Sequence, residues 1–288
     1  MARSEITHKI GERVRAQYEQ KIVPDVRQAL LDEVSCYPSG DVAVLLSSGI
    51  DSHAVLFACI EAGLQPAAYS FALEGHQSTD VKIAENTCEV LGVPFTRVDL
   101  PTSKEHLYRY LNYAIGKLGL TGKADIECCW PMTHAFGEIT QSVVLTGIGA
   151  DDYFATTKKG CMHLREHLDR YRAHTWRQEK SQRRVFKSET MALGKFYHSP
   201  YDSTRFWAEV HDATDWDTVN KPEKALLREA FPELFSQCNV RRHTDLQLGD
   251  SGIAQHFADT LLNSDLNTKG FKSVVGIYNG LVSGELTL

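Results

Sequence analysis

Short apolar runs alternate with segments of helical periodicity through the first half of the chain. Residues 42–46 form a short continuous apolar run, which predicts a strand buried on both faces. Further strands are predicted at residues 67–71 and 95–100, and a fourth buried strand at residues 142–146. The segments between them predict helices, at residues 52–62, 80–91, 103–118 and 131–140. This alternation is typical of an α/β fold, so we expect a doubly wound parallel sheet with helices on both faces.

The two flanking regions have a different pattern. A helix is predicted over residues 12–34, and Tyr37-Pro38-Ser39-Gly40 ends it before the first strand. Beyond Phe154 the pattern indicates helices and no convincing strand. We therefore divide the chain into an N-terminal helical segment (1–40), an α/β core (41–155) and a mostly helical C-terminal region (156–288).

Two polar loops follow buried strands and carry the candidate chemistry. The first, Ser47-Ser48-Gly49-Ile50-Asp51-Ser52, opens directly into a helix. Backbone N–H groups of such a turn, the three serine hydroxyls and the helix N-terminus together suit a phosphate group. The loop lacks the lysine of a Walker motif, and a carboxylate at Asp51 would repel phosphate. Asp51 is therefore expected to hold Mg²⁺, which proteins bind through one or two carboxylates together with phosphates.

The second loop, Thr146-Gly147-Ile148-Gly149-Ala150-Asp151-Asp152, supplies another carboxylate. Ligands of open α/β sheets bind beyond the carboxyl ends of the strands. If the two strands are neighbours, Asp51 and Asp151 converge on one metal. A single Ser/Gly turn before a helix is often an ordinary N-cap, but two such loops in order favour a nucleotide site.

Four blocks resemble a known family in the family's order, at residues 44–52, 70–72, 144–152 and 224–230, and Ser199-Pro200-Tyr201-Asp202 resembles a further segment between the last two. The first loop resembles the pyrophosphate (PP) loop of N-type ATP pyrophosphatases. The whole set is similar to the synthetase domain of asparagine synthetases. The resemblance implies an adenine nucleotide alpha hydrolase-like fold and the use of ATP and Mg²⁺.

The resemblance also implies roles for individual residues. Asp51 and Asp151 match the magnesium-binding aspartates, and Ser47, Ser48, Gly49 and Ser52 match the pyrophosphate loop. Leu45, Leu73 and Gly147 match positions beside adenine and ribose, and Ser70 and Phe71 lie in a nucleotide-binding block. Lys224, Arg242 and His243 join the two aspartates as catalytic candidates. The implied reaction adenylates a small-molecule carboxylate, releases pyrophosphate and passes the acyl group to an amine or ammonia.

The sequence departs from the family at three motif positions. Ser48 replaces a glycine, Ile148 replaces a glutamate near the reacting carbonyl, and His243 stands nearest the position of a lysine that steadies the adenylate. Only about 40 residues precede the first strand, and residue 2 is Ala. We therefore expect no glutaminase domain in this chain, and a nucleophile that is not released from glutamine.

Net charge and its distribution limit the partners. The net charge of −6 argues against a general nucleic-acid binder, yet residues 158–187 carry ten Lys/Arg against three Asp/Glu. Aromatic residues interleave with these basic residues, as in some single-strand binders. We favour solvated helices near the phosphate site and keep a nucleotide or nucleic-acid acceptor as a secondary hypothesis. In the same segment, Cys161, His163 and His167 have a spacing that suits either helix-surface positions or a metal.

Composition also bears on location and on the remaining alternatives. No apolar run reaches the roughly 20 residues of a membrane span, and the charged first residues lack a signal core. Seven scattered cysteines indicate reduced thiols, so we expect a cytoplasmic protein without a membrane partner. Two alternatives to the ligase remain, a nucleotide-binding regulatory protein that has lost catalysis and a nucleotide- or RNA-modifying ATP pyrophosphatase.

Overall fold

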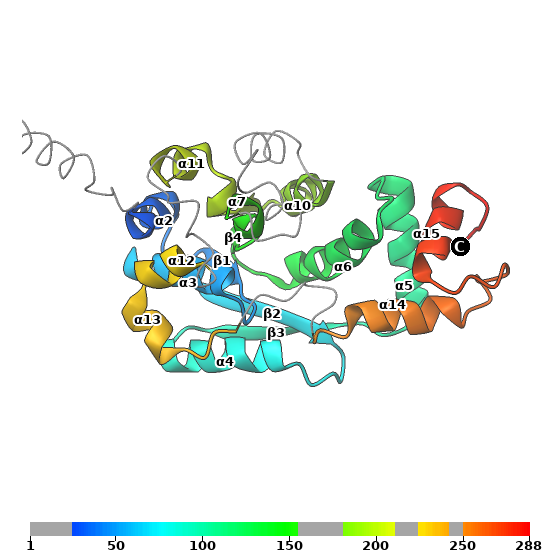
Figure 1. Ribbon diagram of the computed structural model, residues 1–288, viewed down its shortest axis with the longest axis horizontal. Coiled ribbons are helices and arrows are strands. Elements are labelled where there is room, and N and C mark those ends of the chain that lie inside the picture. The colour runs from blue at the N-terminus through cyan, green and yellow to red at the C-terminus, as the bar shows by residue number, and fades with distance from the viewer. Residues whose placement is uncertain (1–24, 155–180, 211–223, 242–249) are drawn as a thin grey trace, which may run out of the picture.

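A five-stranded parallel sheet forms the centre of the molecule in the computed structural model (Figure 1), which describes residues 25–154, 181–210, 224–241 and 250–288. The strands are β1 (Val42–Leu45), β2 (Ala67–Leu73), β3 (Phe95–Leu100), β4 (Val143–Thr146) and β5 (Phe196–His198). Their spatial order is β3-β2-β1-β4-β5, and all neighbours run parallel. The predicted doubly wound α/β fold and its four predicted strands are confirmed.

The order of the sheet reverses at β1. β1 pairs with β2 on one side and with β4 on the other, so that Leu45 lies between Tyr69 and Thr146. The chain therefore leaves β1 and β4 at adjacent points of the same sheet edge. In open α/β sheets this reversal opens the crevice that receives ligands.

Helices cover both faces of the sheet because alternate strand residues point to opposite sides. Val42, Val44 and Leu46 belong to one buried cluster, whereas Ala43 and Leu45 belong to the other. The first cluster contains residues of α2 (Val26–Val34), α3 (Ile50–Glu61), α4 (Thr79–Leu91), α11 (Thr204–Val210), α12 (Ala225–Ala230) and α13 (Pro232–Gln237).

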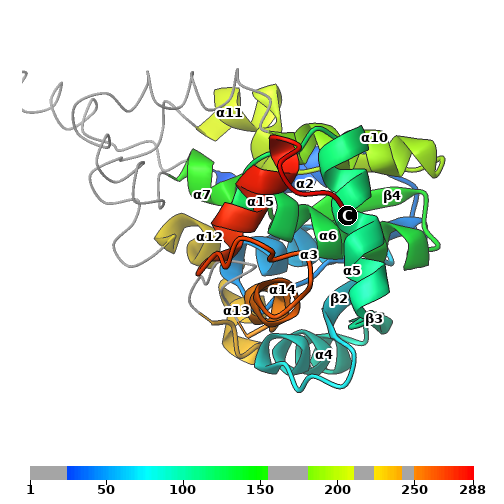
Figure 2. The same ribbon diagram turned by 90° about the vertical axis from the view of Figure 1, so that its right-hand side faces the viewer.

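The second cluster contains residues of α5 (Lys104–Leu111), the π-helix η1 (Asn112–Lys117), α6 (Lys123–Glu138), α10 (Ser181–Ala192), α14 (Ile253–Leu262) and α15 (Val274–Val282). Figure 2 looks onto this end of the molecule, where α14 and α15 lie beside α5 and α6. The short α7 (Ala150–Tyr153) and the 3₁₀ turn η2 (Pro200–Asp202) complete the described elements.

Three predicted elements need correction. The region beyond Phe154 contains a strand, β5, which was missed because it has only three residues and pairs with β4 on one side. The helix expected at 131–140 is α6, which begins at Lys123 and continues through Pro131, because buried residues on both sides of the proline anchor it in the second cluster. The helix expected at 103–118 ends as α-helix at Leu111 and continues as η1. The part of the expected helix at 12–24 lies outside the described residues.

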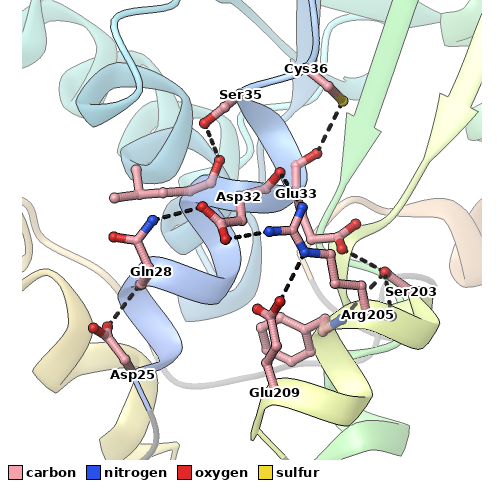
Figure 3. Close-up of polar contacts among 11 residues, drawn as sticks. Asp25, Gln28, Asp32, Glu33, Ser35, Cys36, Ser203, Arg205 and Glu209 are labelled. Atoms are coloured by element: carbon pink, nitrogen blue, oxygen red, sulfur yellow. Dashed lines mark hydrogen bonds and ion pairs between the residues drawn. The ribbon is translucent and has the colours of Figure 1, made fainter.

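Polar contacts fasten α2 to the segment that follows η2 (Figure 3). The guanidinium of Arg205 binds the carboxylate of Asp32 and, at 2.9 Å, that of Glu209. The Ser203 hydroxyl donates to the buried Glu33 carboxylate at 2.6 Å, and His198 Nε2 lies 3.1 Å from the same carboxylate. These contacts fix the position of residues 199–202, which reach the candidate site.

None of the helices in the described ranges is long and apolar enough to cross a bilayer.

Candidate active site at the ends of β1 and β4

The first loop is held by hydrogen bonds among its own residues. The Gly49 N–H donates to Ser47 Oγ at 3.2 Å, and the Ser47 N–H donates to Ser52 Oγ at 3.1 Å. The two hydroxyls of Ser47 and Ser52 lie 3.0 Å apart. Gly49 is the N-cap of α3 in an extended conformation. The loop therefore curls around the start of α3, where a helix N-terminus attracts an anion.

His53 supports this loop from beneath, a role that the sequence spacing did not indicate. Its Nδ1 lies 2.8 Å from the Gly49 carbonyl and its Nε2 lies 3.0 Å from Thr87 Oγ1. Because a carbonyl can only accept, Nδ1 carries the proton, and Nε2 accepts from Thr87. Burial lowers the pKa of His53 to about 4, so the ring is neutral near pH 7.

The Ser48 side chain faces away from its loop neighbours. Ser48 is buried, and its hydroxyl donates to the carboxylate of Asp80 in the first turn of α4. Burial, together with the neighbouring Asp250 carboxylate, raises the pKa of Asp80, and the Ser48 hydrogen bond opposes that shift. The hydroxyl expected to bind phosphate is thus engaged with α4, and Asp80 was not anticipated from the sequence.

Only glycine fits at two positions of the second loop, one against the first loop and one against Asp202. A Cβ at Gly147 would lie 2.6 Å from the Ser52 backbone nitrogen and 2.7 Å from the Asp51 carbonyl carbon. Gly149 has φ +104°, and a Cβ there would lie 2.5 Å from Asp202 Oδ1. The backbones of the two loops therefore touch without side chains between them.

Lys224 joins the two predicted metal ligands. Its Nζ lies 2.6 and 2.5 Å from the carboxylate oxygens of Asp51 and 2.7 Å from Asp151 Oδ1. The lysine is buried, with 1% of its side chain exposed, and has φ +50°, the one positive φ of a non-glycine residue in the described ranges. Burial opposes its charge, but the two carboxylates outweigh burial and raise its pKa.

The donor set fits a hard cation. Asp51 and Asp151 already surround one positive charge, the Lys224 ammonium, at hydrogen-bond distance. Within the described ranges no group of three His, Cys, Asp or Glu side chains has the arrangement of a metal site. A Mg²⁺ ion held by Asp51 and Asp151 would complete its coordination with phosphate oxygens and water, which is its usual environment in nucleotide sites.

Residues 199–202 contact both loops. The Tyr201 hydroxyl donates to the Asp51 carbonyl at 3.1 Å, and the Ser199 hydroxyl donates to the Ile148 carbonyl. Asp202 forms an ion pair with Arg183, whose Nε lies 2.8 Å from Asp202 Oδ2. The sequence marked this segment by its resemblance, but nothing in the spacing indicated Arg183. Together these contacts fix the distance between the loops.

The expected adenosine positions lie at the same sheet edge. Leu45 and Leu73 are the last residues of the neighbouring strands β1 and β2 and are nearly buried. Ser70 and Phe71 lie in the middle of β2, where Ser70 is buried and Phe71 is half-buried. Several sequence-predicted candidates lie outside the described residues. They are Arg242, His243, the part of the basic segment at 158–180, and the group of Cys161, His163 and His167.

With this geometry established, the comparisons with known proteins decide the family. A family model described as asparagine synthase matches residues 25–230. The chain belongs to the asparagine synthase family. Membership makes this protein an ATP-using enzyme of the ATP pyrophosphatase type. We call the first loop the PP-loop because it resembles the pyrophosphate loop of such enzymes. A search of curated proteins found no significant match.

Solved structures show a more distant likeness to this asparagine synthase family member. A predicted subunit of tRNA methyltransferase from Methanocaldococcus jannaschii is 17% identical, with 67% of this chain and 93% of that chain covered and a TM-score of 0.36. NMN synthetase from Francisella tularensis is 15% identical, with 69% and 94% covered and a TM-score of 0.34. The U34-tRNA thiolase NcsA from Methanococcus maripaludis is 17% identical, with 73% and 78% covered and a TM-score of 0.35. Scores this low do not bear on the substrate.

Proposed function

We propose that this protein is an ATP-dependent ligase that adenylates a carboxylate, releases pyrophosphate and transfers the acyl group to an amine. The observation that carries the proposal is the convergence of Asp51 and Asp151 on one cation, beside the PP-loop and the N-terminus of α3. Two carboxylates at a phosphate loop would repel the nucleotide unless a cation lies between them. This arrangement therefore suits Mg·ATP and not an unaccompanied anion.

The residues of the chain would act mainly by positioning and by electrostatics. In the adenylation step a carboxylate oxygen attacks the α-phosphorus, and the bond to the β-phosphate oxygen breaks, so that pyrophosphate leaves with the electron pair. The PP-loop and the start of α3 would hold the β- and γ-phosphates in line with that bond. Asp51 and Asp151 would hold Mg²⁺, which supplies charge neutralisation to the phosphates when bound. Lys224 would keep both aspartates ionised and correctly placed.

Ile148 bears on the second half of the reaction. It is half-buried, packs against the second core cluster and stands where the resemblance places a glutamate near the reacting carbonyl. An isoleucine cannot accept a proton, and ammonia is mostly protonated at neutral pH. We therefore propose that the nucleophile is an organic amine, such as one on a nucleotide or a peptide, and that ammonia is a poor substitute. Replacing Ile148 by Glu should raise the rate with ammonium, because general acid–base assistance is worth roughly 10²–10⁴-fold.

The test is ATP–pyrophosphate exchange with a panel of carboxylates, followed by product analysis with a panel of amines. We expect AMP and pyrophosphate as products. Asp51→Asn and Asp151→Asn should each reduce exchange by at least about tenfold, because the metal clamp on the phosphates is lost. Asp259→Asn, at an exposed position of α14, is the matched control and should leave exchange unchanged. Release of ADP and phosphate, with both site variants fully active, would contradict the proposal.

A further inference from the structure

Among the described residues, the positive charges beside the two loops are engaged by carboxylates, except for that of Arg241. Lys224 lies between Asp51 and Asp151, and Arg183 pairs with Asp202. The PP-loop itself contributes a carboxylate and no lysine. A bound triphosphate brings several more negative charges than the helix N-terminus can balance. The loop therefore needs a cation from another part of the chain.

Arg241 is fixed beside the loop by its backbone. Its N–H donates to the Ser48 carbonyl at 2.8 Å, and Arg241 forms an isolated parallel β-bridge with Gly49. Residues paired in this way lie about 5 Å apart at their backbones. The side chain of Arg241 thus originates next to the two central residues of the PP-loop, and the backbone contact does not depend on that side chain.

The Arg241 side chain is exposed, and in the part of the chain that the structure describes no acceptor forms a hydrogen bond with its guanidinium. Its charge acts on the Asp80 carboxylate, which is also the acceptor for the Ser48 hydroxyl. Arg241 therefore lies near Asp80 at the start of α4, beside Ser48 and Gly49 of the PP-loop. A phosphate chain in the loop would have a cation from Arg241 in addition to the one held by Asp51 and Asp151.

We propose that Arg241 is a ligand of the β- and γ-phosphates of ATP and of the pyrophosphate product, in the place of the missing Walker lysine. This inference rests on the proposed function and adds a phosphate ligand to the same site. A guanidinium suits the role because it stays charged and binds phosphate oxygens in a bidentate manner. It also explains why the chain returns from the C-terminal region to pair with the PP-loop at Gly49.

The experiment measures equilibrium binding of inorganic pyrophosphate, ATP and AMP, each with Mg²⁺, to the full chain. Arg241→Ala should weaken pyrophosphate and ATP binding by at least about tenfold, the value of one charge-assisted hydrogen-bond pair. AMP binding should change less than about twofold, because AMP lacks those phosphates. The affinity of Arg241→Lys for pyrophosphate and ATP should lie between those of wild type and Arg241→Ala. Arg109→Ala, at an exposed arginine of α5, is the matched control and should bind like wild type.

The outcomes separate this inference from the proposed function. If the wild-type protein binds ATP and pyrophosphate and Arg241→Ala binds them with the same affinity, the role of Arg241 is overturned. The proposed ligase function would then be unaffected. An equal loss for AMP, ATP and pyrophosphate would also overturn it, since it would indicate a disturbed loop and not a lost phosphate contact. A wild-type protein that binds neither ATP nor pyrophosphate would overturn the proposed function and this inference together.

Discussion

The two loops of the site are built in opposite ways. The PP-loop is shaped by hydrogen bonds among Ser47, Gly49 and Ser52, which are at most five residues apart. The loop after β4 is shaped by distant residues, since Gly147 packs on the backbone of Asp51 and the Ile148 carbonyl accepts from Ser199. The shape of the PP-loop is therefore mostly set by local contacts, whereas the geometry between the two aspartates is set by tertiary contacts. Three changes would break or sharpen this comparison.

Lys224→Met should have the largest effect on stability. Lys224 forms ion pairs with one aspartate of each loop, and its loss leaves two carboxylates facing each other without a buried cation. Removing one partner of a buried ion pair costs 3–5 kcal/mol, and the partial exposure of the aspartates reduces this to about 3 kcal/mol. Denaturant unfolding measures this loss in the free energy of unfolding. Millimolar Mg²⁺ should restore more stability to this variant than to wild type. Lys82→Met, at an exposed site on α4, is the control, and equal losses in the two variants would contradict the linking role.

Gly147→Ala should cost about 1–3 kcal/mol, the usual range for an overpacked contact. The added Cβ would lie 2.6 Å from the Ser52 nitrogen, so the two loops must separate. Mg·ATP affinity should fall together with stability, because Asp51 and Asp151 move apart. Gly137→Ala, in α6 with nothing within 4 Å of the added atom, should be neutral or slightly stabilising. If Gly147→Ala and Gly137→Ala unfold at the same denaturant midpoint, the two loops can separate at no cost in stability, and the prediction is wrong.

Ser48→Ala should have the smallest effect. The hydroxyl of Ser48 donates to Asp80, so its loss should change pyrophosphate affinity by less than about twofold. Ser47→Ala removes contacts inside the PP-loop and should weaken pyrophosphate binding by about fivefold, since a typical hydrogen bond contributes about 1 kcal/mol. Calorimetric titration with pyrophosphate measures the affinities of the two variants. If Ser48→Ala weakens pyrophosphate binding more than Ser47→Ala does, the Ser48 hydroxyl binds phosphate, as the sequence alone predicted.

The sequence by itself predicted four of the five strands and the two loops of the candidate site. Continuous apolar runs identified β1 and β4, because a strand buried on both faces must be apolar at every position. The alternation with helices identified β2 and β3, of which β3 has exposed positions. The order of the motifs placed Asp51 and Asp151 behind two strands, and the family model agrees with the resemblance. These signals are local, so they can be read along the chain.

Only the tertiary structure decided which side chains complete the site. β5 has three residues with one fully buried, and it is a strand because β4 offers an unpaired edge. The resemblance named Lys224 as a candidate, but only the tertiary structure shows that it forms ion pairs with Asp51 and Asp151 from the N-cap of α12. In the same way, only the structure shows that the Arg241 backbone bonds to Ser48. No periodicity records such pairings, because they depend on how α12 and the segment after α13 pack against α3. The sequence thus predicted which two loops form the candidate phosphate site, and long-range packing determined which charges meet there.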